Sequence, residues 1–194
     1  MRSLSLLLIP ACLWLSACEK GNVDLDNAGS MTLQVMVDEL AYDMPPRSYA
    51  RIKLAEGPHK LIVKDSSGRV LEEAAFRVAK GGLINVSKAN YYIWADLYGD
   101  AALRPSYLKE DWLEIGKQSF FGDFELLDPG LLYVEQKWDF GLSEDFPEDL
   151  LGWNVQKDKY LVRRKLFREP DLIQAYYNAA RQGDPAAAPP PAKP

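Results

Sequence analysis

The segment 90–98 carries the densest group of side chains that could recognise a ligand. Alternate side chains of an extended strand point to the same face, so Tyr92, Trp94, Asp96 and Tyr98 would lie together. Three aromatic rings could stack on a sugar while Asp96 accepts hydrogen bonds from its hydroxyl groups. The opposite face would be formed by Tyr91, Ile93, Ala95 and Leu97. Because a strand with two apolar faces is usually covered on both, we favour packing under the second half of the chain, with carbohydrate or peptidoglycan binding as the alternative.

The other groups that could take part in catalysis form no recognised motif. His59 is the only histidine, and a catalytic histidine would need a nucleophile and an orienting carboxylate, which no sequence pattern supplies. No serine lies in a nucleophile-elbow motif. We therefore expect a packed or hydrogen-bonded structural role for His59, no catalytic residues, no cofactor and no enzymatic activity.

A group of carboxylates between residues 143 and 149 consists of Glu144, Asp145, Glu148 and Asp149. Their spacing matches no EF-hand calcium loop, and a single histidine with so few cysteines excludes a His/Cys metal site. A hydrolase that uses carboxylates such as Asp96 and Glu148 is a second alternative, and it would need them in one cleft. A solvated acidic loop that faces the cations of segment 157–168 is the simpler interpretation.

The N-terminal segment has the parts of a secretory signal. Arg2 supplies a positive charge, residues 4–15 are apolar, and the small residues Ser16 and Ala17 precede a cleavage point. The apolar run is too short to cross a bilayer as a helix, and Pro10 would break it. We expect residues 1–17 to be removed.

Cys18 is the residue to which a definite chemical role can be assigned. Leu15-Ser16-Ala17-Cys18 resembles, position by position, the lipobox of bacterial lipoproteins. The resemblance implies that the mature chain begins at Cys18 with acyl chains on its thiol and amine, which would hold it on a membrane. The following Glu19, in place of Asp, implies the outer membrane, on its periplasmic or surface face.

Composition limits the remaining functions. Loss of residues 1–17 removes one cation and Cys12, so the mature chain has 22 basic and 28 acidic side chains and a net charge of −6. Cys18 is then the only cysteine, which excludes an intramolecular disulfide. A mildly acidic chain with no continuous basic stripe argues against nucleic-acid binding.

The first half of the mature chain is predicted to be β-rich. The polar segment 18–30 is typical of a flexible tether. From Met31 the apolar residues alternate at Leu33, Val35 and Val37, which predicts a half-buried strand. Further short alternating segments, separated by turn signals, are 49–54, 59–64, 70–78, 83–86 and 90–98. We therefore expect a small antiparallel β-sandwich over residues 31–99.

Two stretches of this region resemble the PEGA family of small β-sandwich modules from bacterial surface and envelope proteins. They are Val35-Met36-Val37-Asp38 and the run Leu54–Val63, with its apolar–Gly–x–His–x–apolar order. The resemblance implies a structural or binding module without chemistry of its own.

Residues 100–183 are predicted to be a β-rich extension that ends in one helix. Pro129-Gly130 favours a type II turn in a hairpin whose strands would be 117–127 and 131–139. A strand over 160–167 precedes Glu169-Pro170-Asp171, which is typical of a helix start. The helix would present Leu172, Ile173, Ala175, Tyr176 and Ala179 on one face and end at Gly183. The Pro/Ala-rich segment 184–194 is expected to be disordered.

The sequence thus favours a lipid-anchored cell-envelope protein of the mainly β class. It would act as a non-enzymatic binding, scaffolding or accessory subunit. Its expected partners are the membrane, through acylated Cys18, and an envelope protein or a glycan.

Overall fold

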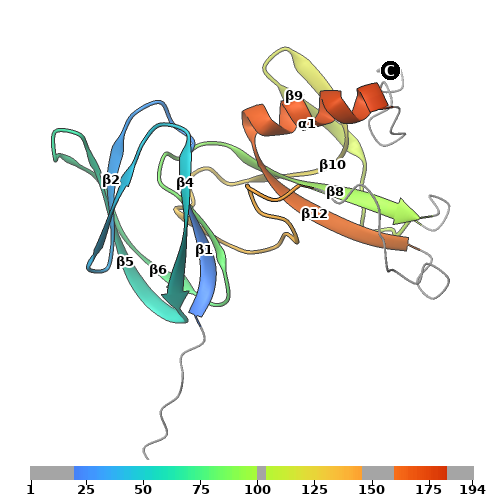
Figure 1. The fold of residues 1–194 in the computed structure, drawn as a ribbon. Coiled ribbons are helices and arrows are strands. Elements are labelled where there is room, and N and C mark those ends of the chain that lie inside the picture. The colour runs from blue at the N-terminus through green and yellow to red at the C-terminus, as the bar shows by residue number, and fades with distance from the viewer. Residues whose placement is uncertain (1–19, 100–103, 146–159, 183–194) are drawn as a thin grey trace, which may run out of the picture.

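The computed structural model describes residues 20–99, 104–145 and 160–182, which form a mainly β fold with one C-terminal helix (Figure 1). This confirms the predicted fold class. The strands are β1 (Lys20–Asn27), β2 (Leu33–Val37), β3 (Leu40–Met44), β4 (Ser48–Ala55), β5 (Gly57–Asp65), β6 (Val70–Val78), β7 (Gly82–Asn85), β8 (Tyr91–Gly99), β9 (Asp111–Ile115), β10 (Gln118–Leu127), β11 (Tyr133–Glu135) and β12 (Tyr160–Arg168), and the helix is α1 (Glu169–Gln182).

The first part of the chain folds as a β-sandwich of two four-stranded sheets. One sheet has the order β3-β2-β5-β6 and is antiparallel throughout. The other has the order β11-β7-β1-β4, in which β1 and β7 are parallel. The alternating apolar residues of the strands fill the space between the sheets, with Val35, Leu61 and Ile84 fully buried. The two-residue period of the sequence therefore sets which face of each strand enters this core.

The predicted flexible tether over residues 18–30 is wrong for residues 20–27, which form β1. This strand lies inside its sheet, between β4 and β7. Val23 and Leu25 are fully buried in the sandwich core, and Asp24 and Asp26 point to the opposite face of the sheet. Val23 and Leu25 alternate with polar residues in the sequence, but with only two apolar positions the segment did not stand out as a strand.

The sandwich also ends at a different place than predicted. The sequence predicts a sandwich over residues 31–99 that includes β8, but β8 leaves the sandwich and becomes an inner strand of a third sheet, ordered β12-β8-β10-β9. β11, from the predicted extension, returns to pair with β7 in the sandwich. The reason is that β8 is apolar on both faces and is covered on both, which the edge of a two-layer sandwich does not provide.

The third sheet is covered on one face by α1, and we call the two together the helix-covered sheet (Figure 1). α1 begins at Glu169, within one residue of the predicted start, and it buries Leu172 and Tyr176. Glu169 and Asp171 lie in the first turn, where their charge favours the helix dipole. The predicted helix and its apolar face are confirmed.

The predicted hairpin over residues 126–132 is wrong. A turn is present, because the Leu131 amide donates to the Asp128 carbonyl at 3.1 Å and the Gly130 amide donates to the Asp128 side chain at 2.8 Å. Gly130 does not adopt the left-handed conformation of a type II turn. The flanking strands separate: β10 pairs with β8 and β9, whereas β11 pairs with β7. The turn signal was local, and the pairing was decided by distant partners.

The sandwich and the helix-covered sheet meet at a junction built on the outer face of sheet β11-β7-β1-β4. An apolar cluster forms its centre and consists of Leu83, Tyr91, Ile93, Leu127, Val134, Trp138 and Leu166. The junction thus uses one face of β8, while the other face of that strand packs under α1.

Candidate functional site

The aromatic face of β8 is buried under α1. Tyr92 and Trp94 are 4% and 5% exposed. The Trp94 ring centroid lies 6.0 Å from that of Tyr176 and 6.1 Å from that of Phe167. These rings are therefore not available to stack on a sugar, and the hypothesis of an aromatic glycan platform is wrong. The competing prediction, that this face packs against the second half of the chain, is confirmed for Tyr92 and Trp94.

Asp96 and Tyr98, the other two residues predicted for that platform, lie farther along β8 and are half-buried. They pair in register with the edge strand β12, Asp96 with Arg163 and Tyr98 with Leu161. They continue the strand away from Trp94, so the four predicted residues do not form one exposed site.

His59 has the hydrogen-bonded structural role that the sequence indicated. Its Nδ1 lies 2.8 Å from Asp38 Oδ2, and its Nε2 lies 2.8 Å from the Ala55 carbonyl oxygen. Burial alone would lower the pKa of His59, but these two hydrogen bonds outweigh it and raise the pKa. Both partners are acceptors, so only the protonated ring can donate to both. The result is a clasp between the turn after β2, the end of β4 and the start of β5.

A buried ion pair fastens the junction. Asp26, on β1, is fully buried and accepts hydrogen bonds from both Nε and Nη2 of Arg168, at the end of β12. The Nε–Oδ2 distance is 3.0 Å. The Tyr91 hydroxyl of β8 donates to the same carboxylate. Burial and the Asp26 charge raise the pKa of Tyr91, which therefore stays protonated as a donor. Side chains from β1, β8 and β12 thus meet at the Asp26 carboxylate, which links the sandwich to the helix-covered sheet.

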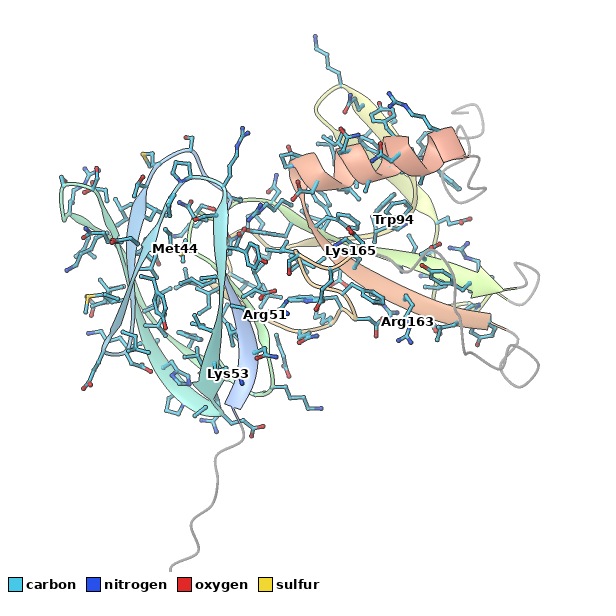
Figure 2. The ribbon with its side chains drawn as sticks, viewed as in Figure 1. Met44, Arg51, Lys53, Trp94, Arg163 and Lys165 are labelled. Atoms are coloured by element: carbon cyan, nitrogen blue, oxygen red, sulfur yellow. The ribbon has the colours of Figure 1, made fainter. Side chains whose placement is uncertain are left out.

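A second charged group lies beside the first, on the same outer face of the sandwich. Arg51 of β4 donates through Nε to Asp24 of β1 at 2.9 Å and pairs with Glu144 at 3.3 Å. Figure 2 shows Arg51 on the side of the sandwich that faces the helix-covered sheet. Asp24 is nearly buried, whereas the Glu144 side chain is partly exposed. The arrangement ties the loop that follows β11 to β1 and β4.

The basic strand β12 contacts the acidic loop, as the sequence predicted, but not entirely as a solvated face. Lys165 is 6% exposed, and its Nζ donates to the carbonyl oxygens of Gly141, at 3.0 Å, and Glu144. Burial lowers the pKa of Lys165. Arg163 pairs with Asp139 at 3.3 Å. The loop carbonyls therefore satisfy a buried ammonium group, a role that sequence reasoning missed.

The carboxylates at the junction are poorly suited to acid catalysis. The Gly141 amide and Arg51 lower the pKa of Glu144, whereas a general acid needs a raised value. Asp24 is held by Arg51 in an ion pair. The pocket that these groups line is small, about 120 Å³. Asp96 is not among the residues that line it, and Glu148, its predicted partner in a hydrolase, lies outside the described residues.

A larger hollow of about 370 Å³ opens at the end of the sandwich where β1 finishes. It is lined by Asn27, Gly29, Ser30, Met31, Leu33, Leu71, Glu72, Val86, Ser87 and Lys88. Met31 and Leu71 are 62% and 41% exposed, although both are apolar. Lys88 and Glu72 form an ion pair of 2.6 Å at the same site. An apolar hollow of this size with a few polar groups is typical of a binding site.

In the ranges 20–99, 104–145 and 160–182, no group of three or more His, Cys, Asp or Glu side chains is placed to hold a metal ion. In the same part of the chain, no helix combines the length and apolar character needed to cross a bilayer. Cys18 and the segment 184–194 lie outside the described residues.

No family model, curated protein or solved structure matches this chain. The lipobox and the PEGA-like module therefore stay predictions from the sequence.

Proposed function

We propose that this protein is a lipid-anchored component of the bacterial cell envelope that acts as a non-enzymatic binding or accessory subunit. The anchor is supported by the Leu15-Ser16-Ala17-Cys18 motif and its signal-like context. The outer membrane is the proposed location because Glu19, not Asp, follows Cys18. A PEGA-like sandwich would present the binding surface.

The observation that carries the binding role is the hollow beside Met31 and Leu71. Two apolar side chains remain in contact with solvent at its rim, while Leu33 and Val86 form part of its buried wall. Exposed apolar side chains that border a concave surface are characteristic of protein interaction sites. An apolar segment of another envelope protein would fit this surface, with the Lys88–Glu72 ion pair available at its edge.

The charged groups of the junction support a structural role instead of a catalytic one. Asp24 and Asp26 are each held by an arginine, and the buried Lys165 is satisfied by loop carbonyls. Groups that hold two parts of a fold together are not free to exchange protons with a substrate. We therefore place ligand recognition at the hollow and assign the junction to stability.

The anchor is tested by labelling cells with a fatty-acid probe. The natural chain should incorporate the probe, and Cys18→Ser should not. Continued labelling of Cys18→Ser would refute the lipoprotein assignment.

The hollow is tested by placing a photo-crosslinking residue at Leu71 in cells. A discrete crosslinked product should form there, and Met31→Asp should reduce its yield at least threefold. A photo-crosslinking residue at Leu131, which is 50% exposed but outside the hollow, is the matched control and should not form this product. Equal yields with and without Met31→Asp would refute the hollow as the binding site.

A further inference from the structure

The first strand begins almost immediately after the proposed lipid anchor. Only Glu19 separates Cys18 from Lys20, the first residue of β1, so the connection is two residue steps long. At no more than about 3.6 Å per residue, this connection spans about 7 Å at full extension. The inference that follows rests on the proposed acylation of Cys18.

The start of β1 is firmly held by its neighbours. Gly21 pairs with Leu54 of β4. On its other side, a Cβ atom at Gly21 would lie 1.3 Å from the Lys80 carbonyl oxygen, so only glycine allows this approach. Peeling β1 away to lengthen the tether would also expose Val23 and Leu25, both fully buried. The anchored end therefore cannot move far from the membrane while the sandwich is folded.

The surface around this end can be defined from the strand register. Lys20 lies opposite Ala55 at the end of β4, and Asn22 lies opposite Lys53. The turn between β6 and β7, which contains the exposed Lys80, packs against Gly21. Figure 2 shows Lys53 toward the end of the sandwich at which β1 begins. Exposed lysines at this end would be attracted to anionic lipid phosphate.

We propose that this end of the sandwich, formed by the start of β1, the end of β4 and the β6–β7 turn, rests on the surface of the anchoring membrane. The fit is to a phospholipid surface, since the anchor restricts its distance and the exposed Lys53 and Lys80 can contact lipid phosphate, although the exposed Glu56 after β4 carries the opposite charge. The hollow lies at the other end of β1, because Asn27 lines it. Seven residue steps at about 3.3 Å place it roughly 23 Å farther from the membrane, where a partner can approach.

The test uses the full-length acylated protein in vesicles of phosphatidylcholine and phosphatidylglycerol with a nitroxide on the lipid headgroup. Acylated Cys18 has no free thiol, so a single introduced cysteine can carry a fluorophore. Ala79→Cys lies in the β6–β7 turn, and Ser66→Cys lies in the β5–β6 turn at the opposite end of those strands. Both positions are exposed. The label at Ala79→Cys should be quenched at least threefold more strongly than the label at Ser66→Cys.

Two controls make the result decisive. A flexible Gly/Ser insertion of 20 residues after Glu19, with an end-to-end distance of about 25 Å, should remove the difference between the two labels. Neutral vesicles should weaken quenching at Ala79→Cys, and unchanged quenching there would overturn the part assigned to the lysines.

The mass of the purified protein shows whether Cys18 is acylated, and so distinguishes failure of the proposed orientation from failure of the lipoprotein assignment. If acyl chains are present on Cys18 and both labels are quenched equally, the orientation is overturned and the lipoprotein assignment stands. If acyl chains are absent, both are overturned.

Discussion

The buried pair between Asp26 and Arg168 gives a quantitative prediction for Arg168→Met. The Asp26 side chain is fully buried, and that of Arg168 is 17% exposed. Methionine retains much of the apolar stem but removes both guanidinium hydrogen bonds to the carboxylate. Removing one partner of a buried ion pair costs about 3–5 kcal/mol, because the other charge stays away from water. We expect a loss of unfolding free energy in this range.

The assay is urea unfolding followed by tryptophan fluorescence, which reports on the junction because Trp138 is buried there. With a slope of about 2 kcal/mol per M urea, the unfolding midpoint should fall by about 1.5–2.5 M. Arg69→Met is the matched control. The Arg69 side chain is 76% exposed in its ion pair with Asp65, and such exposed pairs add little to stability because water screens the two charges.

A double-variant cycle distinguishes loss of the pair from loss of packing. Asp26→Asn combined with Arg168→Met should be more stable than the sum of the single effects predicts, by about 1–3 kcal/mol. Strictly additive effects, or an Arg168→Met protein within about 0.5 kcal/mol of the natural one, would refute the assignment of this pair to the stability of the junction.

Three further predictions concern other parts of the fold. Because the folded-state pKa of His59 is raised, its stabilisation is fully present below the unfolded pKa of about 6.5 and is lost as pH rises through the folded value. The deficit of His59→Gln, measured as urea midpoints, should thus be larger at pH 5.5 than at pH 8.5, and a deficit independent of pH would contradict the clasp. Trp94→Ala should lower stability by about 3–5 kcal/mol in the same assay, since the ring fills the core under α1, and a loss below about 1 kcal/mol would contradict that burial. Gly82→Ala should lower the unfolding free energy by about 1–3 kcal/mol, because its Cβ would lie 2.2 Å from the Val134 carbonyl oxygen. Gly130→Ala, whose Cβ would meet only the Asp128 side chain, is the control. Equal losses of stability in the two variants would contradict the close approach of β11 to β7.

The strands with a clear two-residue period and the helix could be predicted because their signals are local. Leu33, Val35 and Val37 alternate within five residues, and they enter the core as expected. The helix is set by its acidic first turn and its 3.6-residue apolar face. The structural role of His59 followed from the absence of any catalytic motif around it.

Which strands pair with one another could not be predicted in the same way. β1 is not evident in the sequence because polar residues alternate with Val23 and Leu25. Of these, Asp24 and Asp26 form ion pairs at the junction. The turn at Asp128–Gly130 was identified, but it connects strands of different sheets. Turn chemistry sets the local direction of the chain, whereas the sheet that a strand joins depends on apolar faces far away in sequence.

The sequence by itself determined the mainly β class, the terminal helix, the lipobox-like motif at Cys18 and the two apolar faces of β8. Only the tertiary structure decided what those features contact. It buried Trp94 under α1 and brought Asp26 to Arg168, 142 residues away. An apolar face in the sequence indicates that this face is buried, but the element that covers it depends on the packing of the whole chain. The same packing makes β1 begin at Lys20, which leaves only Glu19 between Cys18 and the strand.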